Sequence, residues 1–214
     1  MKKLTTLIIA AFLSLLFNCA ENNPINNVGE TNNGRITRIS QYDAKGELEF
    51  YLAFEYGADG RKTKVLQHNS SDQLFGYSTF QYTNNKTVSK QHVKVSPDNS
   101  FGLSRCYISE YDVKGNETKM SIYSAEDELM EYYVNEFDDE GKITKESMYN
   151  SSAELEKYYL YEYNEKGLNT FTNTYTSSGD LLKHAKCEYD AKGTIIKETV
   201  YFEDQVLYYL VYEY

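Results

Sequence analysis

Residues 163–167 read Tyr-Asn-Glu-Lys-Gly, and an aromatic residue four positions before a glycine recurs with a period of 26 residues. The copies that keep this period begin at Tyr111, Phe137, Tyr163 and Tyr189. A second aromatic series runs in the same period, at Tyr123, Tyr149, Tyr175 and Tyr201. A fixed period indicates one supersecondary unit copied along the chain, so the repeat decides the architecture.

The spacing within the repeat predicts short strands. The intervals between the two series alternate between 12 and 14 residues, which accommodates one strand and one turn each time. The pattern continues upstream through Tyr42, Tyr56, His68 and Tyr82, with a longer loop near Pro97. The chain is rich in Tyr, Thr and Val, and the Tyr-x-x-x-Gly segments suit type I turns with a glycine bulge. We therefore expect an all-β antiparallel meander of about 14 short strands over residues 35–214.

The two faces of the predicted sheet differ in composition. One face carries a column of Glu, a column of Lys or Arg, and tyrosines such as Tyr132 and Tyr158. We expect the acidic and basic columns to meet as diagonal neighbours. The other face carries the first aromatic series and a column of leucines. Because the aliphatic content is low for a thick two-layer core, we expect an open, twisted or curling single sheet, with a closed β-barrel as the alternative.

The segment 206–214, Val-Leu-Tyr-Tyr-Leu-Val-Tyr-Glu-Tyr, is an apolar strand at the predicted edge of the sheet. Edge strands are usually protected by lysine, proline or a bulge, and this one is not. It can pair with the strand around 36–42, with another copy or with a partner strand, or be shielded by sheet twist and the preceding tether. A lipid-facing barrel needs one apolar face, and charges interrupt the face of Tyr214. These charges are Arg105, Glu131, Lys157 and Lys183.

Residues 1–18 have the features of a secretory signal peptide, since Lys2 and Lys3 precede an apolar run too short to span a membrane. The following Leu16-Phe-Asn-Cys19 resembles a bacterial lipobox, which implies that Cys19 is lipidated. The alternative is an ordinary signal peptide with an incidental cysteine. Residues 19–34 are rich in asparagine and predict a flexible tether. We expect a lipid-anchored protein of the bacterial cell envelope, in the outer membrane, on either its surface or its periplasmic face.

The segments 162–167 and 188–193, Glu-Tyr-Asn-Glu-Lys-Gly and Glu-Tyr-Asp-Ala-Lys-Gly, resemble the YD repeats of Rhs-type bacterial proteins. They are also similar to variant MORN-type repeats. The resemblance covers most of residues 35–214 and implies a scaffold of β-hairpin repeats. It does not carry over a toxin-encapsulating role, because this chain has neither a toxin domain nor enough repeats for a shell. The lipid tether and tyrosine-rich sheet are similar in style to spirochaete outer-surface lipoproteins.

Composition and spacing exclude several functions. A formal charge of −10 argues against nucleic acid and anionic headgroups as partners. The three histidines share no metal-ligand spacing and the acidic turn 138–140 suits solvent, so we expect no metal or cofactor. The repeated glutamates indicate scaffold rather than a catalytic pair, and no catalytic motif is present, so we expect no enzyme. Cys106 and Cys187 fall on opposite faces and about six strands apart, too far for a disulfide, so we expect them unpaired unless the sheet closes on itself.

We therefore expect a non-catalytic binding scaffold that presents tyrosines to a protein or a polysaccharide. The alternative is a structural or assembly lipoprotein that self-associates or joins an envelope complex through its C-terminal edge strand. The candidate interaction residues are Tyr132, Tyr158, Tyr209, Leu210 and Tyr212.

Overall fold

The structure is a computed structural model, and it describes residues 34–95 and 100–214. The signal peptide 1–18, the lipidation site Cys19, the tether up to residue 33 and the loop at Pro97 lie outside the described residues. In the described part the backbone forms 14 antiparallel strands. These residues include no helix that is long and apolar enough to cross a membrane.

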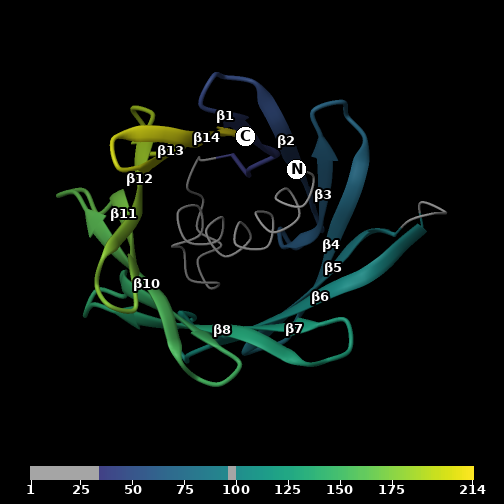
Figure 1. The fold of residues 1–214 in the computed structure, drawn as a ribbon. Coiled ribbons are helices and arrows are strands. Elements are labelled where there is room, and N and C mark those ends of the chain that lie inside the picture. Colours follow the sequence, from purple (N-terminus) through teal and green to yellow (C-terminus); the bar gives the residue numbers. More distant parts are fainter. Residues whose placement is uncertain (1–33, 96–99) are drawn as a thin grey trace.

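The strands follow one another in chain order around the barrel (Figure 1). They are β1 (Arg38–Asp43), β2 (Leu48–Tyr56), β3 (Lys62–Asn69), β4 (Leu74–Tyr82), β5 (Lys86–Val95), β6 (Ser100–Tyr111), β7 (Glu117–Ser124), β8 (Leu129–Phe137), β9 (Ile143–Asn150), β10 (Leu155–Tyr163), β11 (Asn169–Thr176), β12 (Leu181–Tyr189), β13 (Ile195–Phe202) and β14 (Gln205–Glu213). The predicted all-β meander is confirmed.

The expected open sheet is wrong, and the alternative, a closed barrel, is the fold. β14 pairs with β1 in an antiparallel ladder that runs from Arg38↔Glu213 to Asp43↔Tyr208. Figure 1 shows the two strands, at opposite ends of the colour scale, side by side. Closure pairs both edges of the sheet, which is why β14 needs no protecting lysine or proline. Of the ways to cover this edge, pairing with the first strand is the one that occurs.

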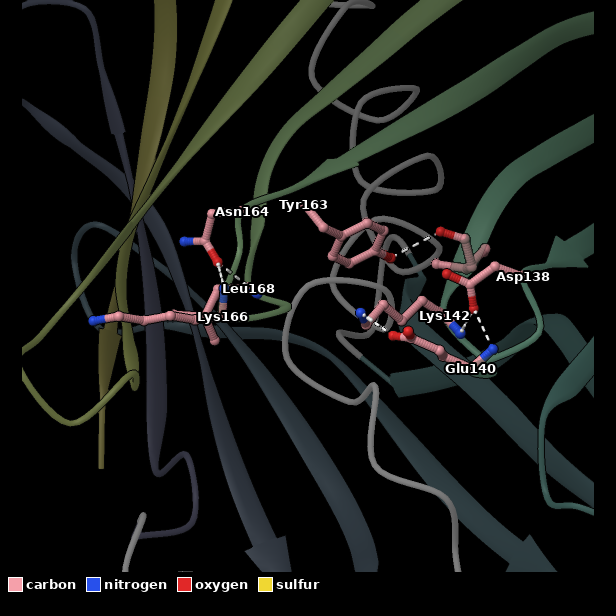
Figure 2. Close-up of polar contacts among 8 residues, drawn as sticks. Asp138, Glu140, Lys142, Tyr163, Asn164, Lys166 and Leu168 are labelled. Carbon is pink, nitrogen blue, oxygen red and sulfur yellow. Dashed lines mark hydrogen bonds and ion pairs between the residues drawn. The ribbon is translucent and has the colours of Figure 1, made fainter.

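The glycine turns have the predicted geometry. In the turn after β8, the Gly141 amide donates to the Asp138 carbonyl, and the Asp138 amide donates to the Lys142 carbonyl. The Asp138 carboxylate accepts hydrogen bonds from the backbone amides of Glu140 and Lys142 (Figure 2). Gly141 has a φ of +83°, which glycine adopts without steric cost. The equivalent turn after β10 uses the Asn164 side chain in the same way.

The first aromatic series faces the barrel axis and ties neighbouring strands together. The Tyr163 hydroxyl donates to the Ile143 carbonyl at 2.8 Å, which joins β10 to the start of β9 (Figure 2). The same bond occurs from Tyr56 to Ile36, Tyr82 to Lys62, Tyr189 to Asn169 and Tyr214 to Ile195. A satisfied hydroxyl of this kind contributes about 0.5–1.5 kcal/mol to stability. The repeated tyrosine therefore has a structural role, since its hydroxyl group links two neighbouring strands.

Most buried residues face the axis, in two apolar clusters. The first contains Ile39, Leu52, Val65, Cys187, Ile195, Leu210 and Tyr212. The second contains Tyr107, Met120, Ile122, Tyr133, Ile143, Met148, Tyr159 and Tyr161. Polar side chains share this inner face, among them Gln67, Glu146 and Glu198. Cys187 lies here and is buried, whereas Cys106 lies on the outer wall, so the predicted opposite faces are confirmed. The two cysteines form no disulfide, and the Cys187 thiol donates a hydrogen bond to Asn169 Oδ1 at 3.3 Å.

The charged columns lie on the outer wall, and the expected diagonal contact between them is wrong. Glu136 lies directly opposite Lys145, with 3.2 Å between the carboxylate and Nζ. The extra residue at each glycine turn shifts the register and brings the two columns face to face. Such exposed pairs contribute at most about 1 kcal/mol each. The charges that share a face with Tyr214 point toward the axis, because that face is the inner one.

Candidate interaction surface at the distal rim

The two ends of the barrel differ in what they carry. Gly34 and Tyr214 lie together at one end, where a Cβ on Gly34 would be 3.3 Å from Tyr214 Cβ. We call this the proximal end, and its turns are 57–61, 83–85, 112–116, 138–142, 164–168 and 190–194. The opposite end is the distal end, and its described turns are 44–47, 70–73, 125–128, 151–154, 177–180 and 203–204. Gly34, the first described residue, thus lies at the proximal end.

Aromatic side chains form a belt on the outer wall, next to the distal turns. Six cross-strand pairs stack with ring centroids 4.7–5.1 Å apart. They are Tyr42–Tyr209, Tyr51–His68, Tyr77–His92, Tyr132–Tyr149, Tyr158–Tyr175 and His184–Tyr201. This aromatic belt gathers the second aromatic series and its partners. Stacked pairs are worth roughly 0.5–1.5 kcal/mol beyond their buried area.

Three of the predicted interaction residues belong to the belt, and the faces of their rings are already occupied. Tyr132, Tyr158 and Tyr209 each stack on a neighbouring tyrosine. Each also has a lysine Nζ over its ring, at 4.8, 5.5 and 4.6 Å from the centroid. A sugar ring binds an aromatic residue by stacking on a free ring face. These tyrosines therefore offer ring edges and hydroxyl groups instead.

The other two predicted residues are not on the surface. Leu210 is 2% exposed and Tyr212 is 5% exposed, and both belong to the first apolar cluster. The physical reason is the alternation of β14, which turns Tyr209 and Val211 outward and their neighbours toward the axis. The sequence placed all of them on an edge strand, and barrel closure removes that edge.

The belt departs from its pattern at two places. Where the other units place a cation, Phe171 packs against His184 with the centroids 6.4 Å apart. Between β6 and β7, Cys106 lies opposite Tyr123 and takes the place of an aromatic residue. Burial raises the pKa of the Cys106 thiol despite nearby Lys90, so this cysteine is not an activated nucleophile at neutral pH. No group of three or more potential metal ligands occurs within residues 34–95 and 100–214.

A bulge interrupts each unit where it reaches the distal end. One residue of each unit has no partner in the ladder, and these residues are Glu49, Phe75, Ser104, Met130, Glu156, Leu182 and Leu207. Bulges re-aim side chains and often adjoin functional sites. The period of the sequence does not reveal them, because an extra residue in every unit leaves the period unchanged.

Exposed apolar side chains gather at the distal end. Among the described residues, ten large hydrophobic side chains are exposed, and seven of them are distal. These seven are Val95, Leu103, Met130, Leu181, Leu182, Phe202 and Leu207. Four of them lie on the adjacent strands β12, β13 and β14, and we call these four the apolar arc. The exposed fractions are 55% for Leu181, 39% for Leu182, 49% for Phe202 and 45% for Leu207.

The turns of the two ends also differ in charge. The described distal turns contain nine acidic residues and one lysine, whereas the proximal turns contain seven acidic and five basic residues. The distal acidic residues are Glu47, Asp72, Glu126, Asp127, Glu128, Glu154, Asp180, Glu203 and Asp204, and the lysine is Lys45. All nine carboxylates are exposed. The distal rim is therefore both apolar and strongly acidic.

No family model matches the sequence, and no curated protein resembles it. Among solved structures, the chain is similar to a porin-like protein from Bacteroides uniformis at 9% identity and a TM-score of 0.47, covering 83% of this chain and 97% of that one. A porin-like protein from Bacteroides vulgatus is 12% identical, with a TM-score of 0.47 and coverages of 84% and 98%. A protein with unknown function from Bacteroides fragilis is 14% identical, with a TM-score of 0.29 and coverages of 72% and 91%.

Proposed function

We propose that this chain is a non-catalytic, lipid-anchored protein of the bacterial cell envelope that binds a protein partner at its distal rim. The observation that supports this most is the gathering of exposed apolar side chains at the end opposite Gly34. Exposed apolar patches bordered by polar residues are typical of protein-binding surfaces. A tether over residues 19–34 would leave the proximal end facing the membrane at a distance of about 20 Å, and the distal rim facing away.

The outer wall argues against a barrel that spans the lipid. A transmembrane barrel presents an apolar band about 25 Å tall to the acyl chains. Here Glu136 and Lys145 form an ion pair on the outer wall, and further Glu–Lys pairs repeat around it. Charged pairs of this kind are suited to water. The barrel is thus better explained as a water-exposed domain held near a membrane by lipid.

The occupied ring faces of the belt favour a protein over a polysaccharide as the partner. Carbohydrate recognition would need free faces, whereas the apolar arc offers flexible aliphatic side chains that pack against a protein surface. Self-association through β14 lacks an unpaired strand edge, because β14 pairs with both β13 and β1. With these two alternatives disfavoured, the exposed apolar surface of the distal rim is best explained as a binding site for a protein partner.

Site-specific photocrosslinking in cells tests the partner. A photoreactive residue at Leu181 or Leu207 should yield a discrete polypeptide adduct, because both side chains are exposed on the apolar arc. The matched control is Val113, which is fully exposed at the proximal end and should yield none. The adduct should disappear in Phe202→Ser. A glycosidase-sensitive smear would point to a polysaccharide, and identical adducts from Val113 would refute binding at the distal rim.

Replacement of Cys19 tests the anchor. Wild-type protein should incorporate labelled palmitate and partition into the detergent phase of a Triton X-114 extract, because several acyl chains give stable anchoring. Cys19→Ser should abolish the label and move the protein to the aqueous phase. Cys106→Ser is the matched control, since it removes a cysteine of the folded barrel and should leave both readouts unchanged. Unlabelled wild-type protein would contradict the proposed anchor.

A further inference from the structure

The distal rim combines exposed apolar side chains with exposed carboxylates. Asp180 directly precedes Leu181, and Glu203 and Asp204 form the turn between Phe202 and Leu207. The Asp180 carboxylate accepts a hydrogen bond from the Ser178 hydroxyl at 2.7 Å. In the described part of the chain, neither Glu203 nor Asp204 forms an ion pair or a hydrogen bond through its side chain. The side chains of Asp180, Glu203 and Asp204 are therefore exposed to solvent beside the apolar arc, and none of the ion pairs of the described residues includes them.

The neighbouring hairpin extends this negative region. The turn between β1 and β2 lies beside β14 and contributes Glu47, and the adjacent bulge contributes Glu49. Lys45 is the only basic residue in the described distal turns. At the proximal end, most turns contain both acidic and basic residues, as in the Glu140–Lys142 pair with 2.6 Å between its charged atoms. The excess of negative charge is thus a property of the rim that carries the apolar arc.

We propose that the partner binds the distal rim through a cationic polypeptide segment that also carries apolar side chains. This rests on the proposed function and specifies its partner. The apolar side chains of the segment cover the arc, and its Lys or Arg residues meet Asp180, Glu203 and Asp204. Complementary charge raises the association rate and selects the partner, while the rim repels nucleic acids and anionic headgroups.

Calorimetric titration of the mature lipidated chain in detergent micelles tests the charge requirement. The probes are three synthetic peptides with identical apolar residues, whose polar positions are all lysine, all serine or all glutamate. The lysine peptide should bind most tightly and the glutamate peptide should not bind. Raising the salt concentration from about 0.05 to 0.5 M should weaken the binding of the lysine peptide, because salt screens exposed charges.

Two charge-matched variants locate the interaction. The double variant Glu203→Gln with Asp204→Asn should lower the affinity for the lysine peptide about three- to tenfold, as expected from the loss of two exposed ion pairs. Asp139→Asn with Glu165→Gln removes the same charge from the proximal turns and should change the affinity less than about twofold. Any partitioning of the peptide into the detergent micelles is the same for the wild-type protein and both variants, so it does not affect the comparison of their affinities. Equal weakening in both variants would overturn the proposal.

The peptides also separate this proposal from the proposed function. If the serine peptide binds as tightly as the lysine peptide and Phe202→Ser weakens both, the rim binds proteins but the cationic requirement is wrong. If no peptide binds and the crosslinks at Leu181 and Leu207 are also absent, both proposals fail.

Discussion

Leu210→Lys is expected to prevent the barrel from folding, although Leu210 is part of a strand that looks like an exposed edge in the sequence. The side chain is 2% exposed and packs with Ile39 and Tyr212 beside the seam between β14 and β1. Truncation of such a leucine to alanine costs about 2–5 kcal/mol. A lysine at this position would also bring a charge into the inner face, opposite the buried Glu198, and even a paired buried charge carries a desolvation penalty of several kcal/mol, whereas a whole domain is stable by only about 5–15 kcal/mol.

Val211→Lys provides the matched control on the next residue. Val211 faces the outer wall, opposite Ser40 and Lys197, so a second lysine there should cost no more than about 1 kcal/mol. Circular dichroism and urea denaturation of both variants measure the difference. A folded Leu210→Lys protein, as stable as Val211→Lys, would show that β14 does not turn Leu210 toward the core.

The barrel is expected to unfold cooperatively in alkali, between about pH 10 and 12. Burial raises the pKa of Tyr159 and of Tyr208 well above the ordinary value for tyrosine. Burial, with a smaller effect of Asp190, raises the pKa of Tyr214 to about 12. An unfolded tyrosine loses its proton near pH 10, so above that pH the unfolded chain releases protons that the folded barrel retains. Stability is therefore full below pH 10 and falls as pH rises, by about 1.4 kcal/mol for each unit of pKa difference at a buried group.

Phenolate absorbance and circular dichroism, recorded on one alkaline titration, measure this effect. Loss of β-structure should coincide with a late, steep rise in absorbance from the buried tyrosines. Tyr159→Phe keeps the ring and removes one ionisable group, so its unfolding midpoint should move to higher pH. If every tyrosine ionised near pH 10 while the dichroism stayed unchanged, the buried positions of these hydroxyl groups would be wrong.

The sequence predicted the strands and turns well, because those features are local. The period fixed by Tyr163 and its equivalents gave the number of strands, and the positive φ of Gly141 followed from its place in the turn. Closure was not predictable, since a meander of this length can end open or closed and the choice depends on curvature accumulated over all strands. The leucine and tyrosine columns were assigned to an exposed single sheet for this reason.

The candidate surface was only partly predictable. The belt residues Tyr132, Tyr158 and Tyr209 were correctly placed on the face that carries the charged columns, because strand alternation needs no tertiary information. Leu210 and Tyr212 were predicted on an exposed edge strand because barrel closure was not foreseen, and both are buried. The distal rim escaped notice because its apolar and acidic residues belong to separate hairpins, which only the barrel brings to one end.

The seam between β1 and β14 has a consequence for how the chain acquires its fold. Every other ladder joins strands adjacent in sequence, whereas the seam pairs Arg38 with Glu213. Neighbouring hairpins can thus form early, while the last ladder requires two distant segments to meet. The entropic penalty of this long loop is modest, since it rises by only about 0.6 kcal/mol per doubling of length. Until the seam closes, the unprotected edge of β14 is open to other chains, so the growing sheet is most prone to aggregate just before its final step.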